Sequence, residues 1–352
     1  DLNHTRYNSF IDAIDREDMV DRIFGLRLID VNVKQGFVEQ LDWTWPELIA
    51  AQFRPTEDGV KATLLGVESR GNRGRAVVRF DLPKLQFNYQ EYDLALDNKN
   101  NVIIVDWIDY LDGMQFSQNI GEWLVAAMPR SPALRKLVDF RNTTENDLFQ
   151  LGEILKAARD SRLDRFMEIY ERLPERYQRQ RIVLLAQVHL ARQVRKRREM
   201  LAGLEALAEY YPQDPLYSLL LLDHHFPRRK YQEATETLLR LQRKLGFDDA
   251  AMEARLSAAA LVMDNTEDAA GYARRALELE NDLELAWWSA LNVRATQEDH
   301  AGCVEALETL ETEFGYELRP QALGRNKMYE GLLASEEYQR WNAAKVGGKG
   351  EW

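Results

Sequence analysis

The sequence is short of the residues that build covalent cross-links, metal clusters and membrane spans. Its 352 residues include one cysteine, Cys303, which excludes an intrachain disulfide and provides no cysteine cluster for a metal. No apolar run reaches the roughly 18 residues that a membrane-spanning helix needs. No linker of low complexity stands out, and only the tail at residues 346–352 is rich in glycine. We therefore expect ordinary folded domains with a frayed tail.

Positive charge is also scarce. The formal net charge is −12, whereas a general nucleic-acid binder needs clustered positive charge to release counterions from the phosphates, so we expect no nucleic-acid partner. Two basic stretches, residues 192–198 and 227–230, fall at expected turns between helices, and each is either a solvated turn or a docking site for an anion. Hydrophobic residues make up 45% of the chain, and its length suggests two domains with full cores.

The periodicity of the N-terminal part changes from helical to alternating. Apolar residues recur at helical spacing over residues 8–33, which predicts one or two helices, and a further helix is expected over residues 45–53. Four runs then alternate as strands do, at residues 60–69, 75–82, 86–96 and 102–110. Their short turns favour an antiparallel meander. This order predicts an α+β domain in which helices cover one face of a sheet.

The last two of these strands carry a recognisable motif. Residues 88–97 and 102–113, followed by Ser117, resemble the end of an NTF2-like (cystatin-like) domain. Bacterial members of that superfamily close the sheet with the pattern Val-Asp-x-x-x-Tyr-x-x-Gly, which is met here from Val105 to Gly113. The resemblance covers about residues 8–128. It implies an NTF2-like cone, a curved antiparallel sheet that bends around a cavity.

A cone of this kind has a candidate pocket. The residues that would line it are Trp43, Tyr92, Asp106 and Tyr110. The alternative is that these aromatic residues are simply core. Enzymatic NTF2-like proteins commonly use a carboxylate–histidine dyad, yet the only histidine in this half is His4. Asp106 and Asp109 should stand on opposite faces of one strand, where they cannot easily pair. We therefore predict no catalytic residue.

A helical pattern recurs about every 34 residues in the C-terminal part. In four hairpins, the first residue expected in the second helix is followed three positions later by a residue expected to pack against the first helix. The four pairs are Arg197 and Met200, Tyr231 and Ala234, Thr266 and Ala269, and His300 and Cys303. This period resembles tetratricopeptide repeats (TPR), which stack helical hairpins. The short side chains at Ala234, Ala269, Ala276 and Cys303 should lie where two helix backbones approach closely.

The resemblance implies a succession of hairpins. They are expected at residues 148–158 with 163–173, in repeats at 181–213, 214–247, 248–281 and 282–315, and in a last pair at 320–333 and 336–344. We accordingly predict an NTF2-like domain over residues 1–128, a linker over 129–143, an all-α TPR-like solenoid over 144–345 and a flexible tail over 346–352.

In TPR proteins the first helix of each hairpin lines a concave surface. Mapped onto this chain, the resemblance predicts that this surface, which we call the first-helix wall, includes His189, Arg192, Asp223, Phe226, Trp288 and Asn292. The wall lacks the two lysines and two asparagines of the chaperone-binding members, so their ligand is not expected. Of Trp287 and Trp288, one ring should be buried and the other should face the groove. The neighbours His224 and His225 diverge by about 100° on a helix, so no metal is expected.

These features predict a non-enzymatic scaffold that binds a peptide or protein partner, without a cofactor. One alternative is an N-terminal pocket for a small ligand or a reaction, positioned by the repeats. Another is that the repeats bind the N-terminal domain, either of the same chain or of the second chain in a homodimer that forms through the NTF2-like domain. Because the chain begins at Asp1, either a signal peptide has been removed or the N-terminus was trimmed. The resemblance favours a periplasmic or cell-surface protein, with the cytoplasm as the alternative.

Overall fold

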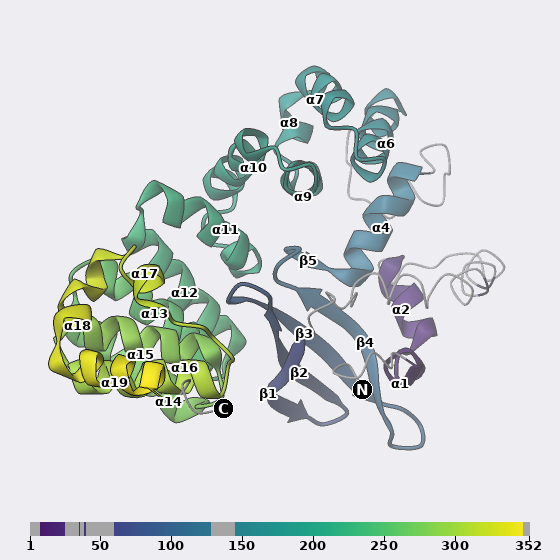
Figure 1. Ribbon diagram of the computed structural model, residues 1–352. Coiled ribbons are helices and arrows are strands. Elements are labelled where there is room, and N and C mark those ends of the chain that lie inside the picture. Colours follow the sequence, from purple (N-terminus) through teal and green to yellow (C-terminus); the bar gives the residue numbers. More distant parts are fainter. Residues whose placement is uncertain (1–7, 25–34, 36–38, 40–59, 128–144, 348–352) are drawn as a thin grey trace. The chain divides into compact units, whose positions relative to one another are not determined.

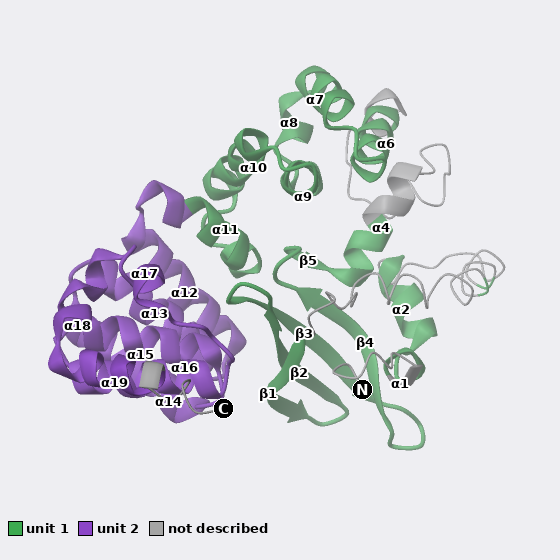
Figure 2. Cartoon of the chain, in the orientation of Figure 1, with its two compact units in different colours: residues 1–224 green, residues 225–352 purple. Residues whose placement is uncertain are grey.

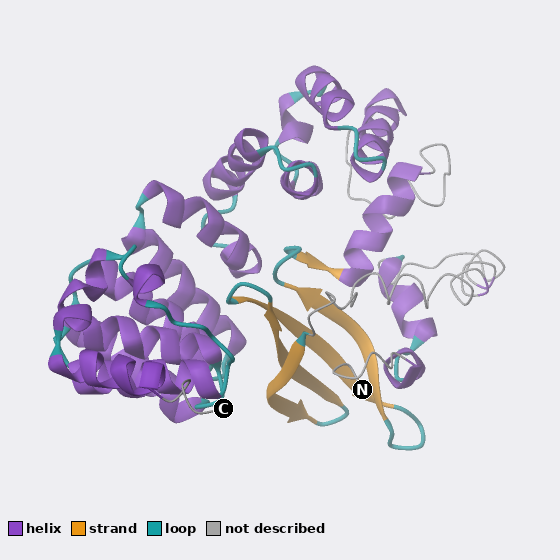
Figure 3. Cartoon of the chain, in the orientation of Figure 1, coloured by secondary structure: helices purple, strands orange, loops and turns teal. Residues whose placement is uncertain are grey.

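The computed structural model describes residues 8–24, 35, 39, 60–127 and 145–347. The chain divides into two compact units, unit 1 at residues 1–224 and unit 2 at residues 225–352 (Figure 2). All the strands that the structure describes lie in unit 1, and both units contain helices (Figure 3). None of the described helices is long and apolar enough to cross a membrane.

The sheet of unit 1 is an antiparallel meander in the order β1-β2-β3-β4-β5 (Figure 1). Its strands are β1 (Lys61–Arg70), β2 (Arg73–Leu82), β3 (Gln86–Leu96), β4 (Val102–Asp109) and β5 (Met114–Gln115). The four predicted strands are confirmed to within two residues at each end. The two-residue strand β5 was not predicted, because it is too short to show an alternating pattern. It pairs with the end of β4 through Ile108 and Asp109.

Helices cover one face of this sheet, as predicted. They are α1 (Asn8–Asp12), α2 (Arg16–Ile23) and α4 (Phe116–Ala127). The first two are separated at Ile14, which forms a β-bridge with Ile104, and Asp15 caps α2 by accepting a hydrogen bond from the Asp18 backbone N–H at 3.0 Å. The core between helices and sheet contains Ile11, Ile14, Met19, Val20, Ile23, Phe24, Ala76, Tyr92, Ile104, Trp107 and Phe116. The helix predicted at residues 45–53 and the linker at 129–143 lie outside the described residues.

The remaining described elements are helical. Unit 1 continues with α6 (Glu145–Arg159), α7 (Leu163–Arg172), α8 (Glu175–Gln178), α9 (Arg181–Gln193), α10 (Arg197–Tyr210), η2 (Pro215–Tyr217) and α11 (Ser218–His225), whose last residue begins unit 2. Unit 2 continues with η3 (Phe226–Arg228), α12 (Tyr231–Leu245), α13 (Ala250–Val262), α14 (Thr266–Leu279), α15 (Glu284–Thr296), α16 (His300–Thr312), α17 (Pro320–Leu323), η4 (Lys327–Tyr329), α18 (Glu330–Ala334) and α19 (Glu336–Gly347).

The predicted hairpin period is confirmed by where the helices begin and end. Helices α10, α12, α14 and α16 start at the four predicted residues, Arg197, Tyr231, Thr266 and His300. A residue in the left-handed backbone region precedes the second helix of the first five hairpins, with φ between 56° and 59°, at Ser161, Arg195, Arg229, Asp264 and Glu298. The next residue donates its N–H back to a carbonyl in the first helix, as Asp299 does to Arg294 at 2.9 Å, which closes that helix.

Short side chains allow the helices of unit 2 to approach closely. Ala234, Ala269, Ala276 and Cys303 are completely buried, as predicted. The contact is close enough for Ser257 Oγ on α13 to donate a hydrogen bond to the Ala269 carbonyl oxygen on α14 at 2.8 Å. A larger side chain at these positions would separate the paired helices.

The last predicted hairpin differs from the structure in its first helix. Residues 320–333 were expected to form one helix, but they are divided into α17, η4 and part of α18. The interruption lies at Asn326, whose backbone is extended and whose side chain accepts a hydrogen bond from the Met328 N–H at 3.1 Å. This cap starts a new helical segment in place of continuing the old one.

The turn geometry predicts that glycine stabilises unit 2 at Glu298. A side chain is disfavoured in the left-handed region, so Glu298→Gly should raise the free energy of unfolding by about 0.5–1 kcal/mol relative to Glu298→Ala. Urea unfolding measures the difference. The control Ala295→Gly, within helix α15, should lower the free energy of unfolding by about 1 kcal/mol. A lower free energy of unfolding for Glu298→Gly than for Glu298→Ala would contradict the turn geometry.

Candidate functional site

The structure places three of the four predicted pocket residues in three different polar environments. Tyr92 lies in the helix-facing core and donates its hydroxyl hydrogen bond to Gln90 Oε1. Tyr110 is buried and donates to Glu91 Oε2 at 2.8 Å. Asp106 is buried among the elements that join β4 to α4. Trp43 lies outside the described residues. The three described residues therefore make separate contacts within the folded unit.

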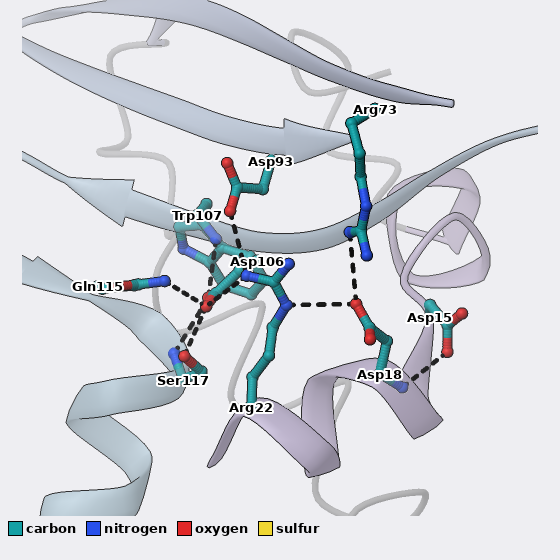
Figure 4. Close-up of polar contacts among 9 residues, drawn as sticks. All are labelled: Asp15, Asp18, Arg22, Arg73, Asp93, Asp106, Trp107, Gln115 and Ser117. Carbon is teal, nitrogen blue, oxygen red and sulfur yellow. Dashed lines mark hydrogen bonds and ion pairs between the residues drawn. The ribbon is translucent and has the colours of Figure 1, made fainter. Parts of the chain in front are cut away.

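The Asp106 carboxylate fixes the beginning of α4 to the sheet (Figure 4). Its oxygens accept hydrogen bonds from Ser117 Oγ at 2.5 Å, Ser117 N at 3.1 Å and Gln115 Nε2 at 2.7 Å. Burial raises the pKa of Asp106, and these hydrogen bonds oppose that rise. The Trp107 and Phe116 rings stack beside it with centroids 4.0 Å apart. Asp106 and Ser117, which belong to the sequence motif, thus join the end of the sheet to the first turn of α4.

Arg22 connects helix α2 to the same region. Its Nη1 lies 3.1 Å from Asp93 Oδ2 and 3.8 Å from Asp106 Oδ2, and its Nε lies 3.2 Å from Asp18 Oδ2 (Figure 4). Arg73 on β2 extends this set of charges, with Nη1 3.8 Å from Asp18 Oδ2. Because one guanidinium is shared among three carboxylates, the network holds α2, β3 and β4 together.

A second buried carboxylate, Asp109, organises the turn between β4 and β5. Asn88 Nδ2 donates to both of its oxygens at 3.0 Å, and Gln90 Nε2 donates to Oδ2 at 2.8 Å. The backbone N–H groups of Leu111 and Asp112 donate to Oδ1 at 2.9 Å. Burial, with a smaller contribution from the nearby Asp112 charge, raises the pKa of Asp109 to about 6. Asp109 therefore joins β3 to the turn.

Sequence reasoning did not identify Asn88 and Gln90 as partners of Asp109. Their signal is the alternation of polar residues along β3, where Asn88, Gln90 and Tyr92 point to one face of the sheet. The register that places Gln90 opposite Asp109 connects this row to β4. Pairing between separate strands is not visible in local periodicity, so the cluster emerges only from the folded sheet.

The turn held by Asp109 docks on α9, η2 and α11 of unit 1. Gly113 has φ 68°, and a Cβ atom there would lie 3.0 Å from Tyr217, 3.1 Å from Leu220 and 3.3 Å from Leu185. Met114 packs against the core formed by α9, α10 and α11. Glycine is therefore required both by the backbone conformation and by the approach of the helices.

His189, a predicted wall residue, takes part in this docking. Its Nε2 lies 3.0 Å from the Asp112 carbonyl oxygen, which can only accept, so Nε2 carries the hydrogen. Burial is the main cause of the lowered pKa of His189, which favours the neutral ring. The contact is made within unit 1, between the β4–β5 turn and helix α9.

Two further wall residues of unit 1 meet each other. Arg192 on α9 and Asp223 on α11 come from successive first helices, and Arg192 Nη2 lies 2.7 Å from Asp223 Oδ2. Their side chains are 32% and 51% exposed, so both can still reach solvent. In unit 2, the rings of Phe226 and Tyr231 lie with centroids 6.2 Å apart.

Trp288 and Asn292 lie one helical turn apart on α15 and contact tyrosines from the C-terminal segment. The Trp288 ring is edge-on to Tyr316 with centroids 5.2 Å apart, and Asn292 Oδ1 accepts a hydrogen bond from the Tyr329 hydroxyl at 2.5 Å. Trp287 donates its Nε1–H to the Asn281 carbonyl oxygen at 2.7 Å. The expected contrast between one buried and one open tryptophan is not found, because both rings are partly buried against the same core.

Within the described part of the chain, no three or more His, Cys, Asp or Glu residues are grouped so that they could hold a metal ion. Cys303 is buried and its thiol pKa is raised by burial to about 12, which leaves it protonated at neutral pH.

Comparison with known proteins finds structural similarity only. No protein-family model matches the chain, and no curated protein matches it. Similar solved structures include MamA of AMB-1, with 14% identity over 49% of this chain and 94% of that one, at a TM-score of 0.38. PilW, a widely conserved type IV pilus biogenesis factor, has 7% identity over 59% of this chain and 96% of that one, at a TM-score of 0.40. YrrB, a TPR protein with an unusual peptide-binding site, has 14% identity over 51% of this chain and 91% of that one, at a TM-score of 0.35. At these TM-scores, the similarities assign no function to this chain.

The docking of the β4–β5 turn predicts a difference between two glycines. Gly113→Ala and Gly71→Ala both place a side chain at positive φ, but a Cβ at Gly71 would meet nothing within 4 Å. Gly113→Ala should therefore lower the free energy of unfolding by at least about 1 kcal/mol more than Gly71→Ala, because it also collides with the helices. Urea unfolding of the full chain measures both. Equal losses would contradict the docking contact.

Proposed function

We propose that this chain is a non-enzymatic scaffold that binds a peptide or protein partner through its first-helix wall. The observation that carries the proposal is the pair formed by Arg192 and Asp223, in which partly exposed side chains of two successive first helices meet. Such a pair presents a donor and an acceptor side by side on the surface of a hairpin stack. A stack of hairpins provides extended binding surfaces without needing a reaction centre.

The wall residues of unit 2 support the same proposal with a different chemistry. Trp288 and Asn292 place an indole ring and an amide one turn apart on α15. Aromatic rings beside polar groups are frequent anchors of protein interfaces, because they bury a large area while keeping a hydrogen bond. The partly buried Trp288 is already oriented by Tyr316, so little side-chain freedom is lost when a partner binds.

For the N-terminal part we propose an NTF2-like module over residues 1–128, joined by a linker at 129–143 to a TPR-like solenoid over 144–345. The antiparallel meander, the helices on one of its faces, and the roles of Asp106, Gly113 and Ser117 support this assignment. The tail at 346–352 and a periplasmic or cell-surface location stay predictions from the sequence, and cell fractionation tests the location.

We also propose that the sheet forms a homodimer through β1. Leu64 and Val67 are 60% and 55% exposed, and they stand opposite Val78 and Ala76. Val78 and Ala76 belong to the helix-facing core, so the apolar face of the sheet continues beyond them onto the exposed strand at its end. An apolar edge strand of this kind is a common site of pairing between chains.

The scaffold proposal predicts that two aromatic residues are needed to capture the partner. Phe226→Ala with Trp288→Ala should reduce capture by the immobilised full chain by at least about tenfold, since hot-spot aromatics dominate interface energy. Quantitative mass spectrometry of the captured proteins measures it, with circular dichroism to verify folding. The control variant, Phe149→Ala with Met263→Ala, removes two side chains that do not belong to the wall and are 56% and 37% exposed. Equal capture by both variants would exclude the wall as the binding surface.

The dimer proposal predicts a change in mass. Leu64→Lys with Val67→Lys should convert a dimer into a monomer at micromolar concentration, because two opposed charged strands repel each other. Light scattering after size-exclusion chromatography measures the mass. Val102→Lys changes a residue that is 59% exposed on β4 and should leave the dimer intact. A monomeric parent protein, or a dimer that survives the double variant, would reject this interface.

A further inference from the structure

Unit 2 contains a cavity that the proposed wall does not use. Its volume is about 1210 Å³, and it lies among α12, the turn that follows it, the start of α13, and α14. Residues that matter for its chemistry are Gln242, Asp248, Glu253, Gly271, Tyr272 and Arg275. The cavity is lined mainly by second helices, and Trp288 and Asn292 on α15 are not among its residues.

The charges around this cavity are predominantly negative. Its lining includes five carboxylates, at Asp248, Glu253, Glu267, Asp268 and Glu278, and three guanidinium groups, at Arg243, Arg274 and Arg275. Two of the arginines are engaged: Arg275 lies 2.9 Å from Asp248, and Arg274 lies 3.7 Å from Glu278. The acidic excess gives the cavity a field that attracts cations.

Glu253 is the unusual member of the lining. It is 2% exposed, and its Oε1 accepts a hydrogen bond from Gln242 Nε2 at 2.8 Å and lies 3.4 Å from Arg275 Nε. Its other oxygen, Oε2, is buried and receives no hydrogen bond within the described part of the chain. Burial raises the pKa of Glu253, against the effects of Gln242 and Arg275. A buried oxygen without a donor is destabilising, and Glu253 is among the residues that line the cavity, so a donor group brought by a ligand would relieve this cost.

Gly271 supplies an independent indication that the cavity is kept open. It lies within helix α14, where glycine is less favourable than almost any other residue. A Cβ atom at this position would meet no atom within 4 Å, so packing does not require glycine here. The space beside Gly271 is therefore open, and Gly271 and Tyr272 both line the cavity.

We propose that this cavity binds a basic side chain, lysine or arginine, from a peptide partner. The ammonium or guanidinium group donates to Glu253 Oε2, which completes the hydrogen bonding of that carboxylate. The apolar stem of the side chain lies beside the Tyr272 ring in the open space next to Gly271, where it packs against the aromatic surface. The site shares no residue with the first-helix wall, so it stands or fails separately from the scaffold proposal.

The test measures binding of two fluorescein-labelled, glycine-rich peptides to the full chain by fluorescence anisotropy at low salt. One peptide carries two lysines and the other two glutamates. The parent protein should bind the lysine peptide and not the glutamate peptide. Glu253→Gln keeps the shape of the side chain but removes its charge, and should weaken binding about tenfold. Gly271→Leu fills the open space and should abolish binding.

The controls separate this site from general surface attraction and from misfolding. Glu308→Gln on α16 removes one exposed negative charge outside the cavity and should leave affinity unchanged. Neither cavity variant should lower the melting temperature, because one removes a buried charge and the other removes a glycine from a helix. The proposal is overturned if the parent does not bind the lysine peptide, if it prefers the glutamate peptide, or if Glu253→Gln and Glu308→Gln weaken binding equally.

Discussion

The architecture of the helical part depends on how each first helix is closed. At Arg195, Arg229, Asp264 and Glu298 the backbone enters the left-handed region, and the following N–H returns to the helix that has just ended. This geometry reverses the chain within a few residues and brings the next helix back along the first. The short side chains at Ala234, Ala269 and Cys303 then allow the helices to come close. The proposed wall and the cavity both depend on this repeated reversal, because both are surfaces of paired helices.

Unit 1 uses buried carboxylates for a related purpose. Asp106 and Asp109 are placed on β4 where the strand meets other elements, and each receives several hydrogen bonds from side chains and backbone N–H groups. A buried carboxylate is stable only when such donors surround it, so each aspartate fixes the positions of its donors. Asp106 orients the beginning of α4, and Asp109 orients the turn that contacts α9 and α11. Their raised pKa values result from burial, and the hydrogen bonds that they accept oppose this rise.

Much of this fold could be predicted from local patterns. Alternation gives β1 to β4, and the 34-residue period gives the starts of α10, α12, α14 and α16, because both depend on neighbouring residues in the chain. Contacts between distant segments could not be predicted in this way. Asn88 and Asp109 meet through strand register, Gly113 meets Tyr217 through docking, and Glu253 meets Arg275 across a hairpin. Nothing in local sequence distinguished Glu253 from an ordinary solvated helix residue.

The contact between His189 and the Asp112 carbonyl has a consequence for selectivity along the wall. A segment tethered in the same chain is present at a high effective concentration, so a peptide bound as we propose would compete with it for that position. On that proposal, the β4–β5 turn is an internal competitor at helix α9. Under the proposed function, partners that do not need His189 would escape this competition and would depend more on Arg192 and Asp223.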